Sequence, residues 1–172
     1  MIEHEPLMRY LQNWVARDEM REAVAATVLA LADSCSAIAE ILALGPLAGL
    51  PLLRHGQNGD GDGRPALETR ASELIIEELS GAPVAYLASG QLELPVPMNL
   101  GAPLYVAIDP LDGSSNIDTN VSAGTIFSVM PMKCDKGEAE TDCFLQKGTQ
   151  QLAAGYVIYG PRTGMALTLG SG

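Results

Sequence analysis

Residues 105–118 read YVAIDPLDGSSNID, an apolar run that leads directly into a segment rich in Asp, Gly and Ser. The apolar run predicts a β-strand over 104–108. Pro110 has a fixed φ and no N–H, so we expect the strand to end there. Asp109 and Asp112 would then lie three positions apart across a tight turn at the strand end. This stretch therefore predicts a polar site at the end of a strand.

The residue types in this turn suit the binding of a cation and a phosphate. Two carboxylates, from Asp109 and Asp112, can share one or two hard cations. Gly113 lets the backbone approach a ligand closely, and Gly113, Ser114 and Ser115 offer N–H groups and hydroxyls to phosphate oxygens. A metal site beside a phosphate cradle is the equipment for metal-assisted phosphate hydrolysis. Asp, Pro, Gly and Ser also form ordinary turns, so the DxxDG spacing alone is more typical of a turn without a ligand.

Helices precede strands along the rest of the chain. Apolar residues recur at steps of three and four over 24–42, which predicts an amphipathic helix ended by Gly45-Pro46. The same spacing predicts a short helix over 7–14 and another helix over 67–79. Runs of β-favouring residues predict strands at 84–88, 104–108, 125–129, 155–159 and 165–169. The predicted fold class is α/β, in mixed α+β layers.

Composition limits the kinds of partner that the chain can have. Its 172 residues fit one domain, and its formal net charge of −11 would repel nucleic acid and an anionic membrane. The most apolar segment, Ala23–Leu44, is interrupted by Asp33 and Glu40 and falls short of an uninterrupted membrane span. Three cysteines are too few, and odd in number, for a secreted disulfide framework. We therefore expect a cytoplasmic protein.

A longer string carries a resemblance to a known family. The segment AIDPLDGSSNID at 107–118, followed by VSAGTIFS at 121–128, resembles the signature of class 1 fructose-1,6-bisphosphatases. The segments AAGYVIYG at 153–160 and MALTL at 165–169 are similar to the next two strands of that family. The inositol monophosphatase superfamily is similar only in the Asp-Pro-Leu-Asp-Gly core, so the residues that follow favour the bisphosphatase branch. The resemblance implies the N-terminal half of a sugar-phosphatase fold over 1–172, with two or three helices, a mixed sheet of about five strands, and no C-terminal domain.

The resemblance also implies an activity and a set of site residues. The family hydrolyses fructose 1,6-bisphosphate to fructose 6-phosphate and phosphate, with Mg²⁺, in gluconeogenesis or the Calvin cycle. The implied metal ligands are Asp109, Asp112 and the carbonyl of Leu111. The implied phosphate-binding residues are Asp112, Gly113, Ser114 and Ser115. The implied catalytic residues are Glu68, which is expected to assist the attacking water, and Asp62, which stands at a position that the family also fills with Asp. The intact family implies a homo-oligomer with a sugar bisphosphate as its ligand.

Three departures from the family pattern bear on activity. The family reads Ser-Glu-Glu after the strand at 84–88, where its two acids ligate metal and help to activate water, but this chain reads Ser89-Gly90-Gln91. Glycine supplies no ligand and a glutamine amide cannot act as a base, and Glu93 is offset by two positions. Glu68 stands where the family has Asp, which keeps the charge and lengthens the arm. Nothing in the sequence corresponds to the family's second half, which holds the sugar.

Two hypotheses follow from these departures. The first is a bisphosphatase that is inactive as an isolated chain. The second is a non-catalytic remnant, or an accessory subunit that associates with an intact relative.

Overall fold

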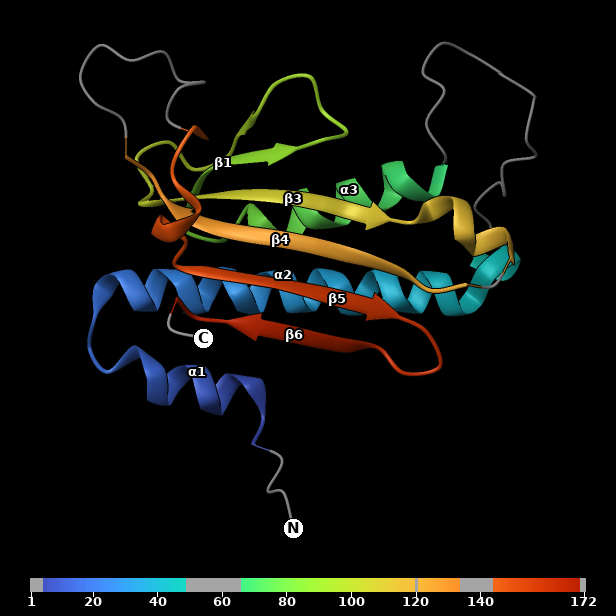
Figure 1. Ribbon diagram of the computed structural model, residues 1–172, viewed down its shortest axis with the longest axis horizontal. Coiled ribbons are helices and arrows are strands. Elements are labelled where there is room, and N and C mark those ends of the chain that lie inside the picture. Colours follow the sequence, from blue (N-terminus) through green and yellow to red (C-terminus); the bar gives the residue numbers. More distant parts are fainter. Residues whose placement is uncertain (1–4, 49–65, 120, 134–143, 171–172) are drawn as a thin grey trace.

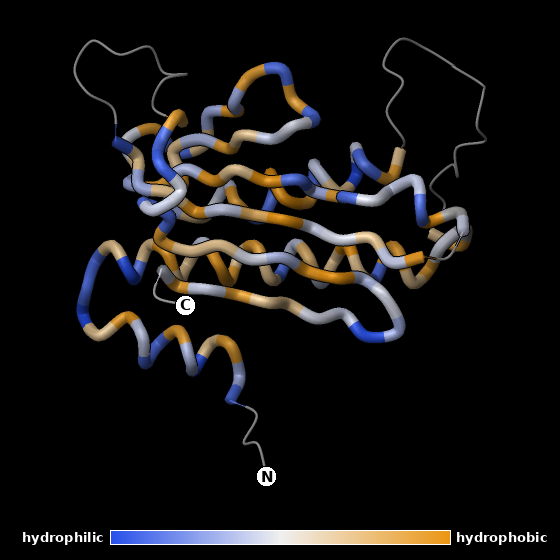
Figure 2. Tube along the Cα trace, viewed as in Figure 1, coloured by the Kyte–Doolittle hydropathy of each residue, from blue (hydrophilic) through white to orange (hydrophobic). Residues whose placement is uncertain are grey.

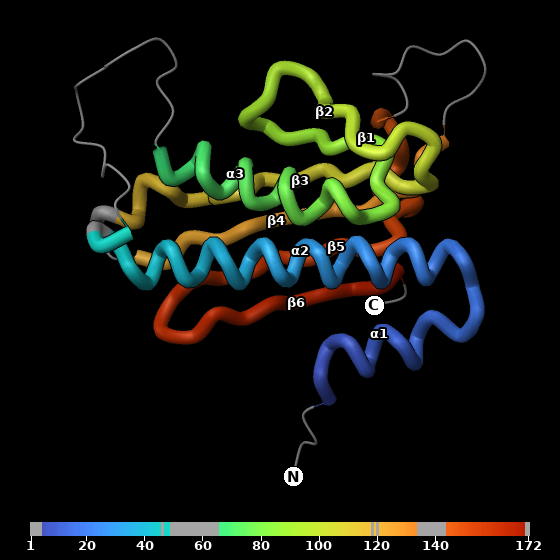
Figure 3. The backbone as a smooth tube through the Cα atoms, turned by 180° about the vertical axis from the view of Figure 1, so that it is seen from behind, coloured from blue at the N-terminus to red at the C-terminus, as the bar shows by residue number. Residues whose placement is uncertain are grey.

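The computed structural model describes residues 5–48, 66–119, 121–133 and 144–170. Within this part of the chain, two helices cover one face of a six-stranded sheet and a third packs beside them (Figures 1 and 3). The α-helices are α1 (Leu7–Val15), α2 (Glu19–Leu44) and α3 (Ala66–Leu79). The strands are β1 (Val84–Ser89), β2 (Val96–Pro97), β3 (Leu104–Asp112), β4 (Ala123–Pro131), β5 (Ala153–Tyr159) and β6 (Gly164–Thr168).

The strands lie in the order β2-β1-β3-β4-β5-β6. The pair β1 and β3 is parallel, and every other pair is antiparallel. This mixed sheet confirms the predicted α/β class, and all five predicted strands are present. The sixth strand, β2, is only two residues long and follows a short loop after β1. Its Val96-Pro97 sequence lacks the alternating run that would have marked it as a strand.

Helix α2 begins and ends at recognisable signals. The side chain of Asp18 caps its first turn by accepting a hydrogen bond from the N–H of Arg21 at 3.0 Å. Gly45, with a φ of 50°, closes the other end. By length and composition α2 could cross a membrane, with a mean hydropathy of 1.7, so the interruption by Asp33 and Glu40 does not exclude a span by itself. The core helix of a globular domain meets the same test, and α2 packs against α3 and β5.

The main core lies between the helices and the sheet. Its fully buried side chains include Leu31 from α2, Ile75 from α3, and Leu104 and Val106 from β3. Each side chain of this size contributes about 1.5–3 kcal/mol when it is fully buried. Hydrophobic residues recur along α2 and along the strands that it covers (Figure 2).

The opposite face of the sheet is covered only in part. Near the start of β3, the rings of Tyr86 and Tyr105 pack edge-on against Phe144, with centroids 5.8 and 4.8 Å away. Further along the strands the face is open, and Ile126 and Tyr156 are 51% and 49% exposed. Figure 1 views this open face, with α2 and α3 behind the strands.

Candidate functional site

Strand β3 continues past Pro110, so the predicted strand end at that residue is wrong. β3 runs to Asp112, and its pairing with β4 changes register between Asp109 and Asp112. Such a bulge is one of the few places where a strand accommodates a proline. The neighbouring strand β1 makes its last pair with β3 at Ser89 and Ile108. No ladder bond on that side therefore requires an N–H from Pro110.

The bulge decides on which face the two aspartates lie. In a regular strand, side chains alternate, so residues three apart point to opposite faces. Here Asp109 pairs with Ile126 and Asp112 pairs with Gly124. Ile126 and Gly124 are two positions apart on β4 and share a face. The extra residue in β3 therefore brings both carboxylates to the same face of the sheet.

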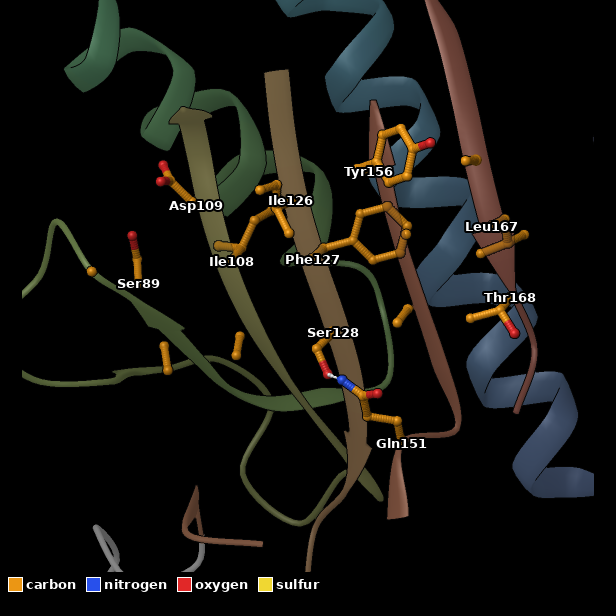
Figure 4. Close-up of a pocket in the computed structure, with 16 residues that line it drawn as sticks. Ser89, Ile108, Asp109, Ile126, Phe127, Ser128, Gln151, Tyr156, Leu167 and Thr168 are labelled. Atoms are coloured by element: carbon orange, nitrogen blue, oxygen red, sulfur yellow. Dashed lines mark hydrogen bonds between the residues drawn. The ribbon is translucent and has the colours of Figure 1, made fainter. Parts of the chain in front are cut away.

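Asp109 lies at one end of a broad groove on the open face of the sheet. The groove has a volume of about 800 Å³, and its lining includes Ser89, Gly90, Ile126 and Tyr156. Figure 4 shows the Asp109 carboxylate beside Ser89, with the apolar side chains further along the groove. One carboxylate oxygen of Asp109, Oδ1, accepts a hydrogen bond from the N–H of Leu111 at 3.3 Å. This local bond ties the half-buried carboxylate to the backbone of the bulge.

The segment after β3 turns tightly through Gly113. Its φ of 74° is a conformation that other residues rarely adopt, and an added Cβ would meet Asn116 Nδ2 at 3.2 Å. A short 3₁₀-helix follows at Ser114–Thr119. Its first turn is closed by a hydrogen bond from the Asn116 N–H to the Gly113 carbonyl at 2.9 Å. Ser115 is exposed at the start of this helix.

Glu68 on α3 reaches this turn. The Ser114 hydroxyl donates a hydrogen bond to Glu68 Oε1, which links positions that are 46 residues apart. The structure therefore brings Glu68 into contact with the predicted phosphate-binding turn. Asp62 lies outside the described residues, as do Cys134 and Cys143. The third cysteine, Cys35, is buried and free.

The segment after β1 presents no carboxylate at the two positions where the family has acids. Gly90 is exposed, and an added Cβ would meet nothing within 4 Å. Gln91 is held by Ser72 of α3, whose hydroxyl donates to Gln91 Oε1 at 2.9 Å. The N–H of Gln91 donates to Ser89 Oγ at 3.2 Å. Glu93 is exposed on the loop that follows.

The oxygen atoms at the bulge are of the kind that a hard cation binds. Asp109, Asp112 and the Leu111 carbonyl supply the kind of donor that Mg²⁺ prefers. Among the described residues, however, no group of three or more His, Cys, Asp or Glu is arranged to hold a metal ion. The exposed Asp112 and the half-buried Asp109 therefore give fewer ligands than a tight magnesium site uses.

Comparison with known proteins identifies the family of the chain. Residues 12–172 match the family model described as fructose-1-6-bisphosphatase, N-terminal domain. The chain belongs to the fructose-1,6-bisphosphatase family. It is 48% identical over 163 residues to fructose-1,6-bisphosphatase class 1 1 of Xanthobacter autotrophicus, which covers 94% of this chain and 44% of that protein. It is 45% identical over 168 residues to fructose-1,6-bisphosphatase class 1 of Azorhizobium caulinodans, covering 96% of this chain and 51% of that protein.

Solved structures of fructose-1,6-bisphosphatases have the same fold. The crystal structure of Leishmania major fructose-1,6-bisphosphatase in holo form superposes with a TM-score of 0.82 at 27% identity, over 98% of this chain and 53% of that one. The resemblance inferred from the DPLDGSSNID segment is thus confirmed. The chain spans about half the length of the fructose-1,6-bisphosphatases that it matches.

Proposed function

We propose that this chain contributes the cation-binding carboxylates and the phosphate-binding turn of a Mg²⁺-dependent fructose-1,6-bisphosphatase. The observation that carries the proposal is the β3 bulge, which sets Asp109 and Asp112 on one face beside the Gly113 turn. Magnesium, when bound, would stabilise the negative charge that develops on the phosphoryl oxygens. The residues that would hold it are Asp109, Asp112 and the carbonyl of Leu111.

The turn supplies the groups for the phosphate that is cleaved. The backbone N–H groups after Gly113 and the hydroxyls of Ser114 and Ser115 can donate to its oxygens. Ser114 has a single hydroxyl proton, which it donates to Glu68. A phosphate that takes over this proton would leave Glu68 Oε1 available to accept a hydrogen bond from water. Glu68 would in this way help to orient the attacking water.

We propose that the 172 residues alone do not hydrolyse the bisphosphate. Gly90 and Gln91 leave the site without the two acids of the family, and loss of a general base costs about 10²–10⁴-fold in rate. The 172 residues span about half the length of the relatives, and the resemblance implies that the family's other half holds the sugar. Holding the reactants in place is worth up to about 7–11 kcal/mol of the barrier.

Phosphate release from fructose 1,6-bisphosphate tests this proposal. We expect the purified chain with Mg²⁺ to release phosphate no faster than its Asp112→Asn variant. Release that disappears on Asp112→Asn would contradict the expected inactivity. Fusing the chain, with Gly90→Glu and Gln91→Glu, to the C-terminal half of the Xanthobacter relative should produce activity that depends on Asp112. A folded fusion without activity would contradict the proposed site.

The missing acids also favour a second candidate, a non-catalytic subunit that associates with an intact relative. Co-purification with a full-length class 1 relative, without any activity in the fusion, would favour this alternative. In either case we propose a cytoplasmic role in sugar-phosphate metabolism, in gluconeogenesis or the Calvin cycle, as part of an oligomer. Support for this setting comes from the family and from the small number of cysteines.

A further inference from the structure

We propose that Thr125 and Tyr159 are positioning residues that hold the β3 bulge in shape and thereby keep Asp109 and Asp112 on one face. The proposal deepens the cation site proposed above. It depends on that site only for its ligand, because the bulge and its hydrogen bonds are features of the fold.

The Pro110 carbonyl depends on a side chain for its hydrogen bond. Pro110 lies inside the register shift, where the β3–β4 ladder is interrupted. It is buried, and a buried carbonyl needs a partner. Thr125 of β4, which is 0% exposed, donates from its hydroxyl to this carbonyl at 2.8 Å. The side chain of Thr125 therefore replaces a backbone bond at the irregular point of the strand.

Tyr159 of β5 completes the chain of hydrogen bonds. Its hydroxyl lies 2.6 Å from Thr125 Oγ1. The proton of Thr125 is committed to the carbonyl, which can only accept, so Tyr159 is the donor in this contact. Thr125 pairs with Val157 and Ala123 pairs with Tyr159, which makes Thr125 and Tyr159 diagonal neighbours on one face of the sheet. Three adjacent strands are thus linked at the bulge.

Helix α2 closes this network from the other side. The thiol of Cys35, 2% exposed, lies next to the hydroxyls of Tyr159 and Thr125. Burial, and secondarily the neighbouring Cys35, raises the pKa of Tyr159 far above its usual range. Tyr159 therefore keeps its proton and remains a donor to Thr125 at every pH at which the protein is handled. The bulge is anchored to the core and not to a solvent-exposed group.

The network has a specific consequence for the acid pair. If the bulge relaxed into a regular ladder, Asp109 and Asp112 would return to alternation and point to opposite faces. The Thr125 hydroxyl opposes this relaxation because the bulged geometry gives the Pro110 carbonyl its partner. Valine has nearly the shape of threonine but no hydroxyl, so Thr125→Val removes the bonds to the Pro110 carbonyl and to Tyr159 while keeping a side chain of similar size.

Hydrogen exchange of the full chain, followed by mass spectrometry, tests the inference without any ligand. Thr125→Val should speed exchange of the peptide covering 109–116 by roughly tenfold or more, and Thr125→Ser should restore it. Thr27→Val is the matched control, because Thr27 is equally buried and bonds only within its own helix, to the Ala23 carbonyl. Tyr159→Phe should also speed hydrogen exchange of the peptide covering 109–116. Tyr156→Phe, at an exposed position of the same strand, should not.

Binding of Mn²⁺ alone, counted by electron paramagnetic resonance, gives a second readout. Loss of a group that orients a metal ligand typically costs about 10–100-fold in affinity, and we expect such a loss in Thr125→Val but not in Thr27→Val. Exchange at 109–116 that is the same in Thr125→Val and Thr27→Val overturns the inference. Absence of Mn²⁺ binding in the unmodified chain contradicts the proposed cation site instead, and the exchange result still decides the role of Thr125 and Tyr159.

Discussion

Replacing Gly90 and Gln91 by glutamates should tighten Mg²⁺ binding at the proposed cation site. Ser89 pairs with Ile108 in the parallel β1–β3 ladder, so position 90 follows beside Asp109, and both line the same groove. An added Cβ at position 90 meets nothing within 4 Å. At position 91, a glutamate can accept the hydrogen bond that Ser72 now donates to the glutamine. Both substitutions therefore fit the existing backbone.

The expected gain follows from the distance between neighbouring strands. These lie about 4.8 Å apart, so an acid at position 90 can approach a cation held by Asp109 to contact distance. Two unit charges about 4 Å apart in water interact by about 1 kcal/mol, hence a divalent ion by about 2 kcal/mol for each added carboxylate. Since about 1.4 kcal/mol corresponds to a tenfold change in affinity, two added acids should tighten Mg²⁺ binding by roughly 100–1,000-fold. An affinity of about 1 mM, typical of the weakest protein sites, would reach roughly 1–10 μM.

Titration calorimetry with Mg²⁺ measures this gain. The matched control is Thr149→Glu with Gln150→Glu, which also changes the net charge from −11 to −13 but at exposed positions beside Gln151, at the end of the groove away from Asp109. A double variant that binds Mg²⁺ no more tightly than this control would refute the reasoning, because charge alone would then explain any gain. Micromolar Mg²⁺ binding by the unmodified chain would also refute the reasoning, because the site would then be tight without the added acids. We expect no bisphosphatase activity from the double variant, since its 172 residues span only about half the length of the relatives.

Three further predictions test other parts of the molecule. Gly113→Ala should cost about 1–2 kcal/mol of stability because of its positive φ, lowering the melting temperature, whereas Gly148→Ala, with open space around it, should not. Because the folded protein raises the pKa of Tyr159, the tyrosine loses its proton more easily in the unfolded chain. The stability that the protonated tyrosine gives is therefore present below about pH 9–10 and lost at higher pH. Thermal melts should show a smaller loss of stability at high pH in Tyr159→Phe. The open sheet face should make the isolated chain self-associate in sedimentation, which Ile126→Lys should reduce and Leu100→Lys, an exposed position outside the groove, should not.

The predictable part of the fold follows from local periodicity. The stripe over 24–42 corresponds to α2, and each of the five predicted strands lies within one residue or a few residues of the observed one. Periodicity reports which side chains face a core, and these elements are long enough to show it. Strand β2 is too short to carry such a pattern and forms only because β1 offers it an edge.

The contacts of the site depend on pairing that no local pattern contains. Glu68 meets Ser114 across 46 residues because α3 and the turn after β3 are brought together by the sheet. Only the family resemblance placed Glu68 at the site in advance. Thr125 and Tyr159 were not predicted at all, because their hydrogen bond exists only once the registers of β3–β4 and β4–β5 are set. A threonine and a tyrosine in apolar strands otherwise read as ordinary core residues.

The odd spacing of Asp109 and Asp112 nonetheless indicates an irregularity in the strand. Two carboxylates that share a cation must lie on one face, and a strand places residues on one face only at even separations. Asp109 and Asp112 are three apart, so they require either a strand that ends between them or one extra residue within it. Pro110 suits the end of a strand, but a bulge is an equally suitable place for a proline. A buried hydroxyl opposite that proline, such as that of Thr125, is the feature that distinguishes the bulge, because a strand that simply ended would leave its carbonyl to water.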